Sequence, residues 1–283
     1  MKIIHAYVTG LKSVFSNKKM VLLLFGIQLV FALILMTPIT HGFEKLFGNS
    51  LLGQELLKGN TGRVFVEFLV HRTGIVSLEM KLLVLVGLVY LVVTVFLNGG
   101  IIGCFAKRGR FGAGPFFSDA GVYFWRFFRL LLFSGVFLIV AFLIYMLVDM
   151  VLMSFKGDSE PAAFFLKAGG FLILGFLFLL IRMVFDFAKI RTVLSRKKGM
   201  FRTGLWAWRF VLEHLGRILG LYMLLAVTGL ALFVFFTQVM KIIPANTGVL
   251  IFALFLWQQI HTLVRSGFKM MSLAAQCTLY RSL

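Results

Sequence analysis

The chain has 283 residues, of which 60% are hydrophobic and 14% are charged, and it carries a formal net charge of +19 at pH 7. A soluble domain of this size needs a far more polar surface, so the composition excludes a water-soluble globular protein and indicates a membrane protein. The positive charge does not indicate a nucleic-acid partner, because most Lys and Arg residues flank apolar runs, where they set membrane topology and meet anionic lipid headgroups.

Six apolar runs are each able to cross a bilayer, which takes about 20 residues of helix. Six such runs are too many for the buried helices of a soluble bundle, which is the alternative interpretation. The fold class is therefore predicted to be all-α, with one polytopic membrane domain over residues 1–283 and six transmembrane helices. The predicted spans are residues 20–37, 82–106, 130–148, 164–187, 218–240 and 242–264.

The first span begins after Lys18 and Lys19, as the core of a signal peptide would. Its apolar stretch is longer than a typical signal core, and the following LMTPITHGFEK offers no clear small-x-small cleavage site, so we interpret it as a retained helix. The outer loop after it, residues 38–81, contains the segment FEKLFGNSLLGQELLKG, which predicts one or two short amphipathic helices on the outer leaflet. A partner-binding role for this loop stays open.

Basic residues are distributed unequally between the two sides of the predicted membrane. Of the 29 Lys and Arg residues, 20 lie in the N-terminal segment, the second and fourth connections and the C-terminal tail, whereas 8 lie on the other side. Positive residues stay in the cytoplasm during insertion. The distribution predicts an N-in/C-in topology with both termini cytoplasmic, and we assign the chain to the bacterial cytoplasmic (inner) membrane. The densest cluster, SRKKGMFR at residues 195–202, is interpreted as topogenic, with specific binding of anionic lipid as the alternative.

Similar segments at a fixed offset indicate an internal repeat. GVYFWRF at residues 121–127 is followed 83 residues later by GLWAWRF at residues 204–210, and RMVFDF from Arg182 is followed at the same offset by RSGFKM from Arg265. A third echo, FAK, begins at Phe105 and again at Phe187. We expect repeated hairpin units, each with a cytoplasmic segment, a span, an outer loop and a returning span.

The repeated Trp-Arg-Phe segments have the composition of helices that lie in the membrane interface, with aromatic rings at headgroup depth and guanidinium groups near the phosphates. We therefore predict an interfacial elbow helix before each odd-numbered span. A lipid-headgroup or substrate gate is the second interpretation of these segments. The candidate lipid-anchoring residues are Trp125, Arg126, Arg129, Trp206, Trp208 and Arg209.

Polar residues inside the spans are candidate functional residues, because they are costly there. Arg182 and Asp186 lie four residues apart on one predicted helix, which indicates either an intrahelical ion pair or a gating or proton-linked site. Hydrogen bonds between helices also explain the amides in the spans. The candidate polar pocket, in the cytoplasmic half, consists of Asn98, Arg182, Asp186, Gln258 and His261.

Motifs of catalysis and metal binding do not occur in the sequence. It contains no Walker-type glycine loop, no His-Glu-x-x-His and no Gly-x-Ser-x-Gly. Cys104 and Cys277 lie on or near the reducing cytoplasmic side, where a disulfide is not expected, and neither has a Cys or His partner at metal-ligand spacing. We therefore expect no catalytic residue, no metal and no cofactor, and we predict that the chain is not an enzyme.

The segments GVYFWRF and GLWAWRF, together with the FAK span ends, resemble bacterial six-helix membrane families grouped around the membrane domain of glycerophosphodiester phosphodiesterases. This resemblance covers most of the chain, and it implies the membrane part without the catalytic domain of those phosphodiesterases. GLKSVFSNKKMVLLLFGIQL, residues 10–29, also resembles the elbow and first span of ABC-2-type permeases. That resemblance implies six spans with both ends inside, although the repeated elbow before later spans departs from the permease pattern.

An enzyme is the third class of function and lacks motifs in the sequence, and two other functions fit this architecture. The first is a permease-like or transport-associated subunit that handles lipid or another amphiphile. The second is a non-catalytic membrane scaffold or assembly factor that binds lipids or partner proteins. The expected partners are membrane lipids with anionic headgroups, and a partner ATPase or another membrane subunit.

Overall fold

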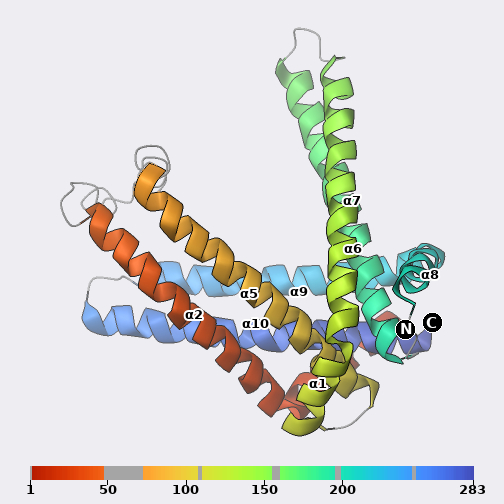
Figure 1. The fold of residues 1–283 in the computed structure, drawn as a ribbon, viewed down its shortest axis with the longest axis horizontal. Helices are drawn as coiled ribbons and strands as arrows, with labels where there is room; N and C mark the ends of the chain where they lie inside the picture. The colour runs from red at the N-terminus through yellow and green to blue at the C-terminus, as the bar shows by residue number, and fades with distance from the viewer. Residues whose placement is uncertain (1, 48–72, 108–109, 155–159, 195–198, 244–246) are drawn as a thin grey trace. The chain divides into compact units, whose positions relative to one another are not determined.

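The computed structural model describes residues 2–47, 73–107, 110–154, 160–194, 199–243 and 247–283. Within these ranges helices are joined by short connections, and no strand occurs. Figure 1 shows the helices in chain order. They are α1 (Lys2–Ser16), α2 (Lys18–Phe47), α5 (Thr73–Ala106), α6 (Ala113–Ser154), α7 (Glu160–Leu194), α8 (Met200–Glu213), α9 (Leu215–Ile242) and α10 (Gly248–Ser282).

Six of these helices are long and apolar enough to cross a membrane. Their middle turns expose large apolar side chains, for example Ile139 at 62% and Leu172 at 76%. Soluble proteins rarely expose continuous apolar surface of this kind, so the chain is an integral membrane protein, and the predicted all-α polytopic fold class is confirmed. The candidate spans are Lys18–Thr37, Lys81–Ala106, Ala113–Val151, Leu166–Leu194, Leu215–Ile242 and Gly248–Ser282.

The helices run further than the predicted spans. α2 continues to Phe47 and α5 begins at Thr73, so the predicted outer loop of residues 38–81 is partly helical, and residues 48–72 lie outside the described ones. The last helix begins at Gly248 instead of residue 242 and continues 18 residues past the predicted end at residue 264. The predicted spans end where Lys or Arg interrupts an apolar run. Both residues are good helix formers, so the helix itself continues past them.

The chain forms two compact units. The smaller unit, Leu22–Thr94, contains most of α2 and α5. Within it Phe31 and Tyr90 pack edge to face, with ring centroids 5.2 Å apart. The larger unit consists of Met1–Val21 and Val95–Leu283, and it contains all of the sites below.

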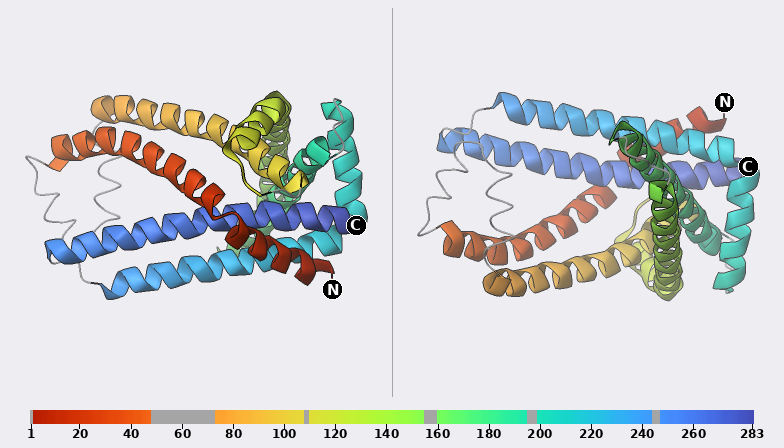
Figure 2. Two further views of the ribbon diagram at one scale, coloured as in Figure 1. Left: turned by 90° about the horizontal axis from the view of Figure 1, so that it is seen from below. Right: turned by 90° about the horizontal axis from the view of Figure 1, so that it is seen from above.

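The core of the larger unit is built on the second half of α10, where small residues alternate with Met and Leu and most side chains are buried. α1 lies directly against this segment. A Cβ atom added at Gly10 would lie 2.8 Å from the carbonyl oxygen of Met271 and 2.9 Å from Cβ of Ala275, so only glycine allows this approach. α9 lies beside α10, and α6 lies beside α7, in all views of Figures 1 and 2.

Elbow helices precede two of the spans. α1 is separated from α2 at Asn17, whose side-chain Nδ2 donates to the carbonyl oxygen of Ser13 at 3.0 Å. α8 is separated from α9 at His214. The outer face of α1 carries an apolar stripe at helical spacing, as a helix in the membrane interface requires. The stripe consists of Ile4, Val8, Leu11 and Phe15, all of them exposed.

The prediction of a separate elbow helix before the third span is wrong. α6 is continuous over 42 residues, from Ala113 to Ser154. Residues 127–133 read FFRLLLF and contain no residue that interrupts a helix, in contrast to the junctions at Asn17 and His214. A helix of this length is about 63 Å long at 1.5 Å per residue, which is roughly twice the hydrocarbon thickness of a bilayer.

Candidate functional site

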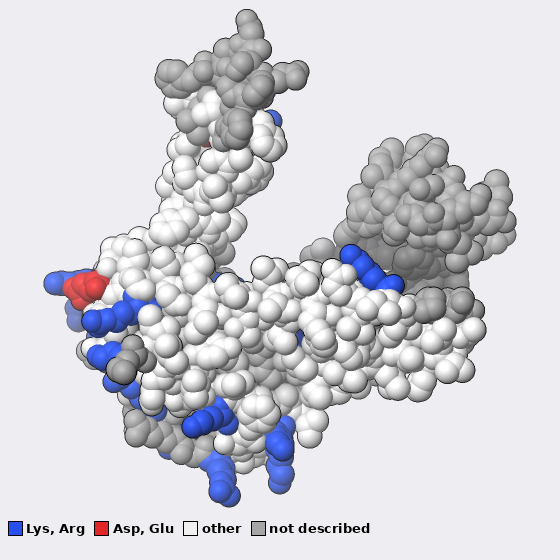
Figure 3. All heavy atoms as spheres, turned by 180° about the vertical axis from the view of Figure 1, so that it is seen from behind, with Lys and Arg blue, Asp and Glu red and all other residues white. Residues whose placement is uncertain are grey.

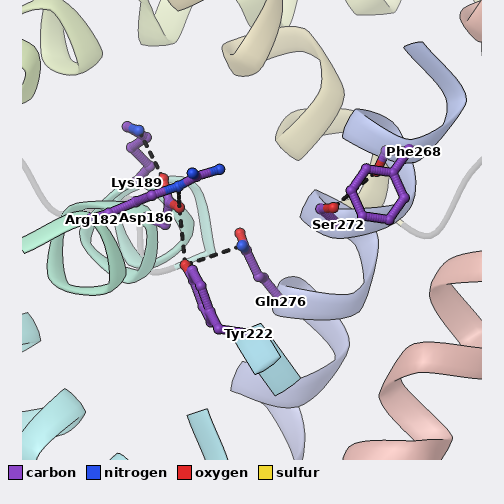
Figure 4. A network of polar contacts seen from close by, with 7 residues as sticks. All are labelled: Arg182, Asp186, Lys189, Tyr222, Phe268, Ser272 and Gln276. Atoms are coloured by element: carbon purple, nitrogen blue, oxygen red, sulfur yellow. Dashed lines mark hydrogen bonds and ion pairs between the residues drawn. The ribbon is translucent and has the colours of Figure 1, made fainter. Parts of the chain in front are cut away.

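Asp186 on α7 lies at the centre of a polar cluster that joins three helices (Figure 4). Lys189 Nζ donates to its Oδ1 at 3.0 Å, and the hydroxyl of Tyr222 on α9 donates to its Oδ2 at 2.9 Å. Gln276 on α10 donates from Nε2 to the Tyr222 hydroxyl at 3.1 Å. Arg182 Nε lies 3.9 Å from Asp186 Oδ2. We call these five residues the Asp186 cluster.

The partners of Asp186 differ in burial. The Lys189 side chain is 22% exposed and that of Arg182 is 75% exposed, while the Asp186 side chain itself is 14% exposed. An exposed pair at 3.9 Å contributes little, whereas short contacts in a partly dry environment contribute more. The intrahelical Arg182–Asp186 pair is therefore present, but Lys189 and Tyr222 are the main partners of the carboxylate.

The cluster ties α7, α9 and α10 together at the end of the core. Tyr222 and Gln276 are 7% and 3% exposed, so both polar groups are held away from solvent and need each other as partners. The Oε1 atom of Gln276 is buried and has no hydrogen-bond partner among the described residues. The Gln276 amide is expected to keep one orientation, because its Nε2 group already donates to the Tyr222 hydroxyl.

The structure divides the candidate polar pocket. Arg182 and Asp186 lie together in the Asp186 cluster, but His261 stacks on Phe236, with ring centroids 4.6 Å apart. His261 precedes Gln276 on the same helix by about 22 Å of helix axis at 1.5 Å per residue, and Gln258 precedes it by about 27 Å. The predicted single pocket is thus not formed by these residues.

Asn98, the remaining member of the predicted pocket, lies on α5 beside the contact between α5 and α6. Its Oδ1 atom is buried without a hydrogen-bond partner in the described part of the chain. Next to it, a Cβ atom at Gly99 would lie 3.2 Å from the backbone of Ala120, and one at Gly103 would lie 2.7 Å from Cβ of Asp119. Close helix packing explains this region, and it contributes no residue to the Asp186 cluster.

A second cluster, which the sequence did not reveal, joins α8 to α7 and α10. The Arg191 guanidinium lies over the ring of Trp206, 3.5 Å from its centroid. Trp206 stacks on Phe210 at 4.7 Å, and Tyr280 lies 5.5 Å from Phe210 and 6.4 Å from Phe187. We call these residues the aromatic clamp. Its only sequence signal was the Trp-Arg-Phe repeat, which does not indicate the partners on α7 and α10.

The candidate lipid-anchoring residues face different surroundings. Trp206 points into the aromatic clamp, whereas Trp208 is 38% exposed. The Arg209 side chain is 82% exposed and pairs with Glu213 at 2.8 Å along the outer surface of α8. On α6, Trp125 is 65% exposed and Arg129 is exposed as well.

Arg126 is partly covered, and its guanidinium lies 5.8 Å from the ring centroid of Tyr123. Of the six candidate anchors, four are therefore exposed, and Arg126 and Trp206 are half-buried against aromatic or cationic neighbours.

An apolar pocket of about 210 Å³ lies between α6, α7 and α8. Its walls are the aromatic and aliphatic side chains of α6 and α7, and α8 closes it on one side. Phe137 of α6 and Trp208 of α8 face each other there, with stacked rings 6.5 Å apart. The pocket is lined by Leu130, Phe133, Phe137, Val184, Phe185, Gly204, Leu205 and Trp208.

No family model, no curated protein and no solved structure matches this chain. The two resemblances noted in the sequence therefore stay predictions. Among the described residues, no group of three or more His, Cys, Asp and Glu side chains lies close enough to hold a metal ion. The structure therefore combines a membrane protein fold with a polar cluster around Asp186, an amphipathic helix α8 and an apolar pocket beside that helix.

Proposed function

We propose that the chain is a permease-like or transport-associated subunit that handles a lipid or another amphiphile in the bacterial inner membrane, with both termini in the cytoplasm. The observation that carries this proposal is the apolar pocket beside α8. Its occupant is one acyl chain of the amphiphile. The proposed role is binding without catalysis, and a partner ATPase or another membrane subunit supplies the energy for any transport.

The pocket has the size and surroundings that an acyl chain requires. Drug-sized solutes occupy pockets of roughly 300–1,000 Å³, so a pocket of 210 Å³ fits part of one chain rather than a compact solute. The outer face of α8 exposes Leu205, Trp208 and Leu212 at helical spacing, next to exposed Arg202 and Arg209. Such a face lies at headgroup depth. A lipid beside α8 can therefore place a chain in the pocket and its phosphate near an arginine.

Filling the pocket tests the proposal. Gly204 lines the pocket, and apart from its own helix backbone and chain neighbours no described atom lies within 4 Å of an added Cβ, so Gly204→Leu is the substitution chosen to fill it. Each displaced methylene removes about 0.8 kcal/mol of binding, so excluding two of them lowers lipid affinity roughly tenfold. The measurement is native mass spectrometry of lipids retained after purification in mild detergent.

The matched control is Gly121→Leu, since Gly121 is the repeat counterpart of Gly204, also has open space around it and does not line the pocket. We expect lipid retention by Gly121→Leu to equal that of the original chain. Equal retention by the Gly204→Leu variant, with unchanged thermal stability, would contradict a lipid-handling role for this pocket.

A membrane scaffold or assembly factor is the second candidate, and the Asp186 cluster favours it. Both carboxylate oxygens of Asp186 already have short partners on α7 and α9, which is typical of a cluster that fixes helices. A scaffold predicts that substitutions in the cluster lower the amount of folded protein without changing lipid retention. A transport subunit predicts that the Gly204→Leu variant folds normally but loses lipid.

A further inference from the structure

A second hollow lies between α1 and α10, on different helices from the acyl-chain pocket and sharing no residue with it. Its volume is about 710 Å³, within the range of roughly 300–1,000 Å³ that small-molecule and cofactor sites occupy. It is the groove beside the close contact of Gly10 with Met271 and Ala275. We call it the α1–α10 groove.

The lining of the α1–α10 groove is polar and positively charged. Lys12, Arg110 and Arg281 contribute positive charges, and His5 contributes an imidazole. The remaining lining side chains are mostly hydroxyl and amide groups, and no Asp or Glu is among them. Arrangements of Lys, Arg and hydroxyl donors without a carboxylate are typical of phosphate-binding sites.

Two of the basic side chains are free to bind a ligand. Lys12 and Arg110 are exposed, and neither makes an ion pair or side-chain hydrogen bond with another described residue. Figure 3 shows Lys and Arg side chains gathered around the end that carries α1, α8 and the C-terminus, whereas the hairpin of α6 and α7 is almost free of them. The groove takes its basic residues from α1, from the segment before α6 and from the end of α10.

Hydrogen bonds hold two parts of the groove wall in place without using Lys12 or Arg110. Arg281 donates from Nη2 to the carbonyl oxygens of Phe105 at 3.1 Å and Ala106 at 2.8 Å, at the C-terminal end of α5. Asn17 Oδ1 accepts from the backbone N–H of Phe111 at 2.9 Å, which fixes the segment after Arg110. A preformed site loses less conformational entropy on binding than a mobile one.

We propose that the α1–α10 groove binds a phosphate group, with Lys12 and Arg110 as its principal ligands and Arg281 as the positioned third charge. This phosphate belongs either to a lipid headgroup or to a free phosphate compound in water. The groove is independent of the acyl-chain pocket, so either site can fail its test without the other.

The expected effect of each charge is moderate. A Lys or Arg near an anionic surface contributes an amount equivalent to about fivefold in affinity. Lys12→Ala and Arg110→Ala are therefore each expected to weaken phosphate binding about fivefold, and the double variant about 25-fold if the two act independently. Because both side chains are exposed and have no ion pair or side-chain hydrogen bond within the described ranges, the unfolding temperature should not change.

The experiment uses the full chain in phosphatidylcholine nanodiscs. In one arm, inorganic phosphate is titrated and binding is measured by calorimetry. In the other arm, dioleoyl phosphatidic acid is added to the nanodiscs and the bound lipid is counted by native mass spectrometry. The matched control is Lys19→Ala, which removes one exposed positive charge close to α1 but outside the groove, and Lys12→Arg keeps the charge.

If the Lys12→Ala and Arg110→Ala variants bind one or both anions about fivefold more weakly, the groove binds phosphate. The arm in which the weakening occurs, inorganic phosphate or phosphatidic acid, identifies the source. The proposal is overturned if the control Lys19→Ala weakens binding as much as Lys12→Ala does. It is also overturned if neither anion binds the original chain more tightly than the double variant.

Discussion

Asp186 has two short contacts of different kinds, one with a charge on its own helix and one with a buried hydroxyl on another helix. The spacing of Arg182 and Asp186 in the sequence predicted the weaker of its ion pairs. Lys189, three residues after Asp186, also has the spacing of an intrahelical ion pair. Helical spacing alone does not show whether Arg182 or Lys189 lies closer to the Asp186 carboxylate. Tyr222 and Gln276 gave no signal, because contacts between helices are not encoded in local spacing.

Substitutions in the Asp186 cluster should separate these contacts. Asp186→Asn leaves Lys189 without its counter-charge, and Tyr222→Phe leaves the buried amide of Gln276 without an acceptor, so each should lower stability by about 1–3 kcal/mol. The two should couple by at least about 0.5 kcal/mol in a double-mutant cycle. Thermal unfolding in detergent measures both effects.

Arg182→Ala is the control within the same cluster. Its side chain is 75% exposed and its contact with Asp186 is long, so we expect almost no loss of stability. A large loss with Arg182→Ala and none with Tyr222→Phe would show that the ranking of the partners is wrong.

At the scale of helices, apolar runs located six spans but not their full lengths. The second half of α10, which forms the core, lies beyond the last predicted span, because Arg265 and Lys269 interrupt the apolar run. Its small residues were the available signal, since Ser266, Gly267 and Ala275 permit close packing. The continuity of α6 was missed because the same Trp-Arg-Phe composition occurs in a separate elbow at α8 and within a longer helix at α6.

The close approach of α1 to α10 predicts that Gly10→Ala is destabilising. The added methyl group would lie 2.8 Å from the backbone oxygen of Met271, so the two helices must separate. Overpacking of this kind costs about 1–3 kcal/mol. Thermal unfolding of the purified protein is the measurement.

Gly135→Ala is the matched control for this helix contact. Gly135 lies inside α6, and outside its own helix backbone and chain neighbours no described atom lies within 4 Å of an added Cβ, so alanine should be neutral or should stabilise by up to about 1 kcal/mol through its helix propensity. If Gly10→Ala is equally harmless, α1 does not pack on α10 as the structure has it.

At the scale of the whole chain, the unequal distribution of Lys and Arg is the property on which the proposed topology depends. The apolar fraction and the six apolar runs identified a membrane protein with helical spans. They carry no information on which solute or partner it binds, because recognition depends on a few contacts between helices distant in sequence. The α1–α10 groove is an example, since its basic residues are separated by up to 276 positions, from His5 to Arg281.

Cysteine labelling tests the orientation. In a chain with Cys104→Ser and Cys277→Ser, we expect Lys241→Cys to react with a membrane-impermeant maleimide added outside intact cells. Arg209→Cys should react only after the membrane is disrupted, because positive residues of α8 are proposed to face the cytoplasm. Labelling of Arg209→Cys in intact cells would reverse the proposed orientation, and with it the side from which the α1–α10 groove is reached.

The packing of α1 on the second half of α10 also has a consequence for biosynthesis. Gly10 and Ala275 are in contact, yet a ribosome adding about 5–20 residues per second needs roughly 13–53 s to make the chain between them. During that interval α1 cannot form its contact with α10. Its apolar stripe gives it an alternative, because the bilayer surface can hold the helix until its partner is synthesised.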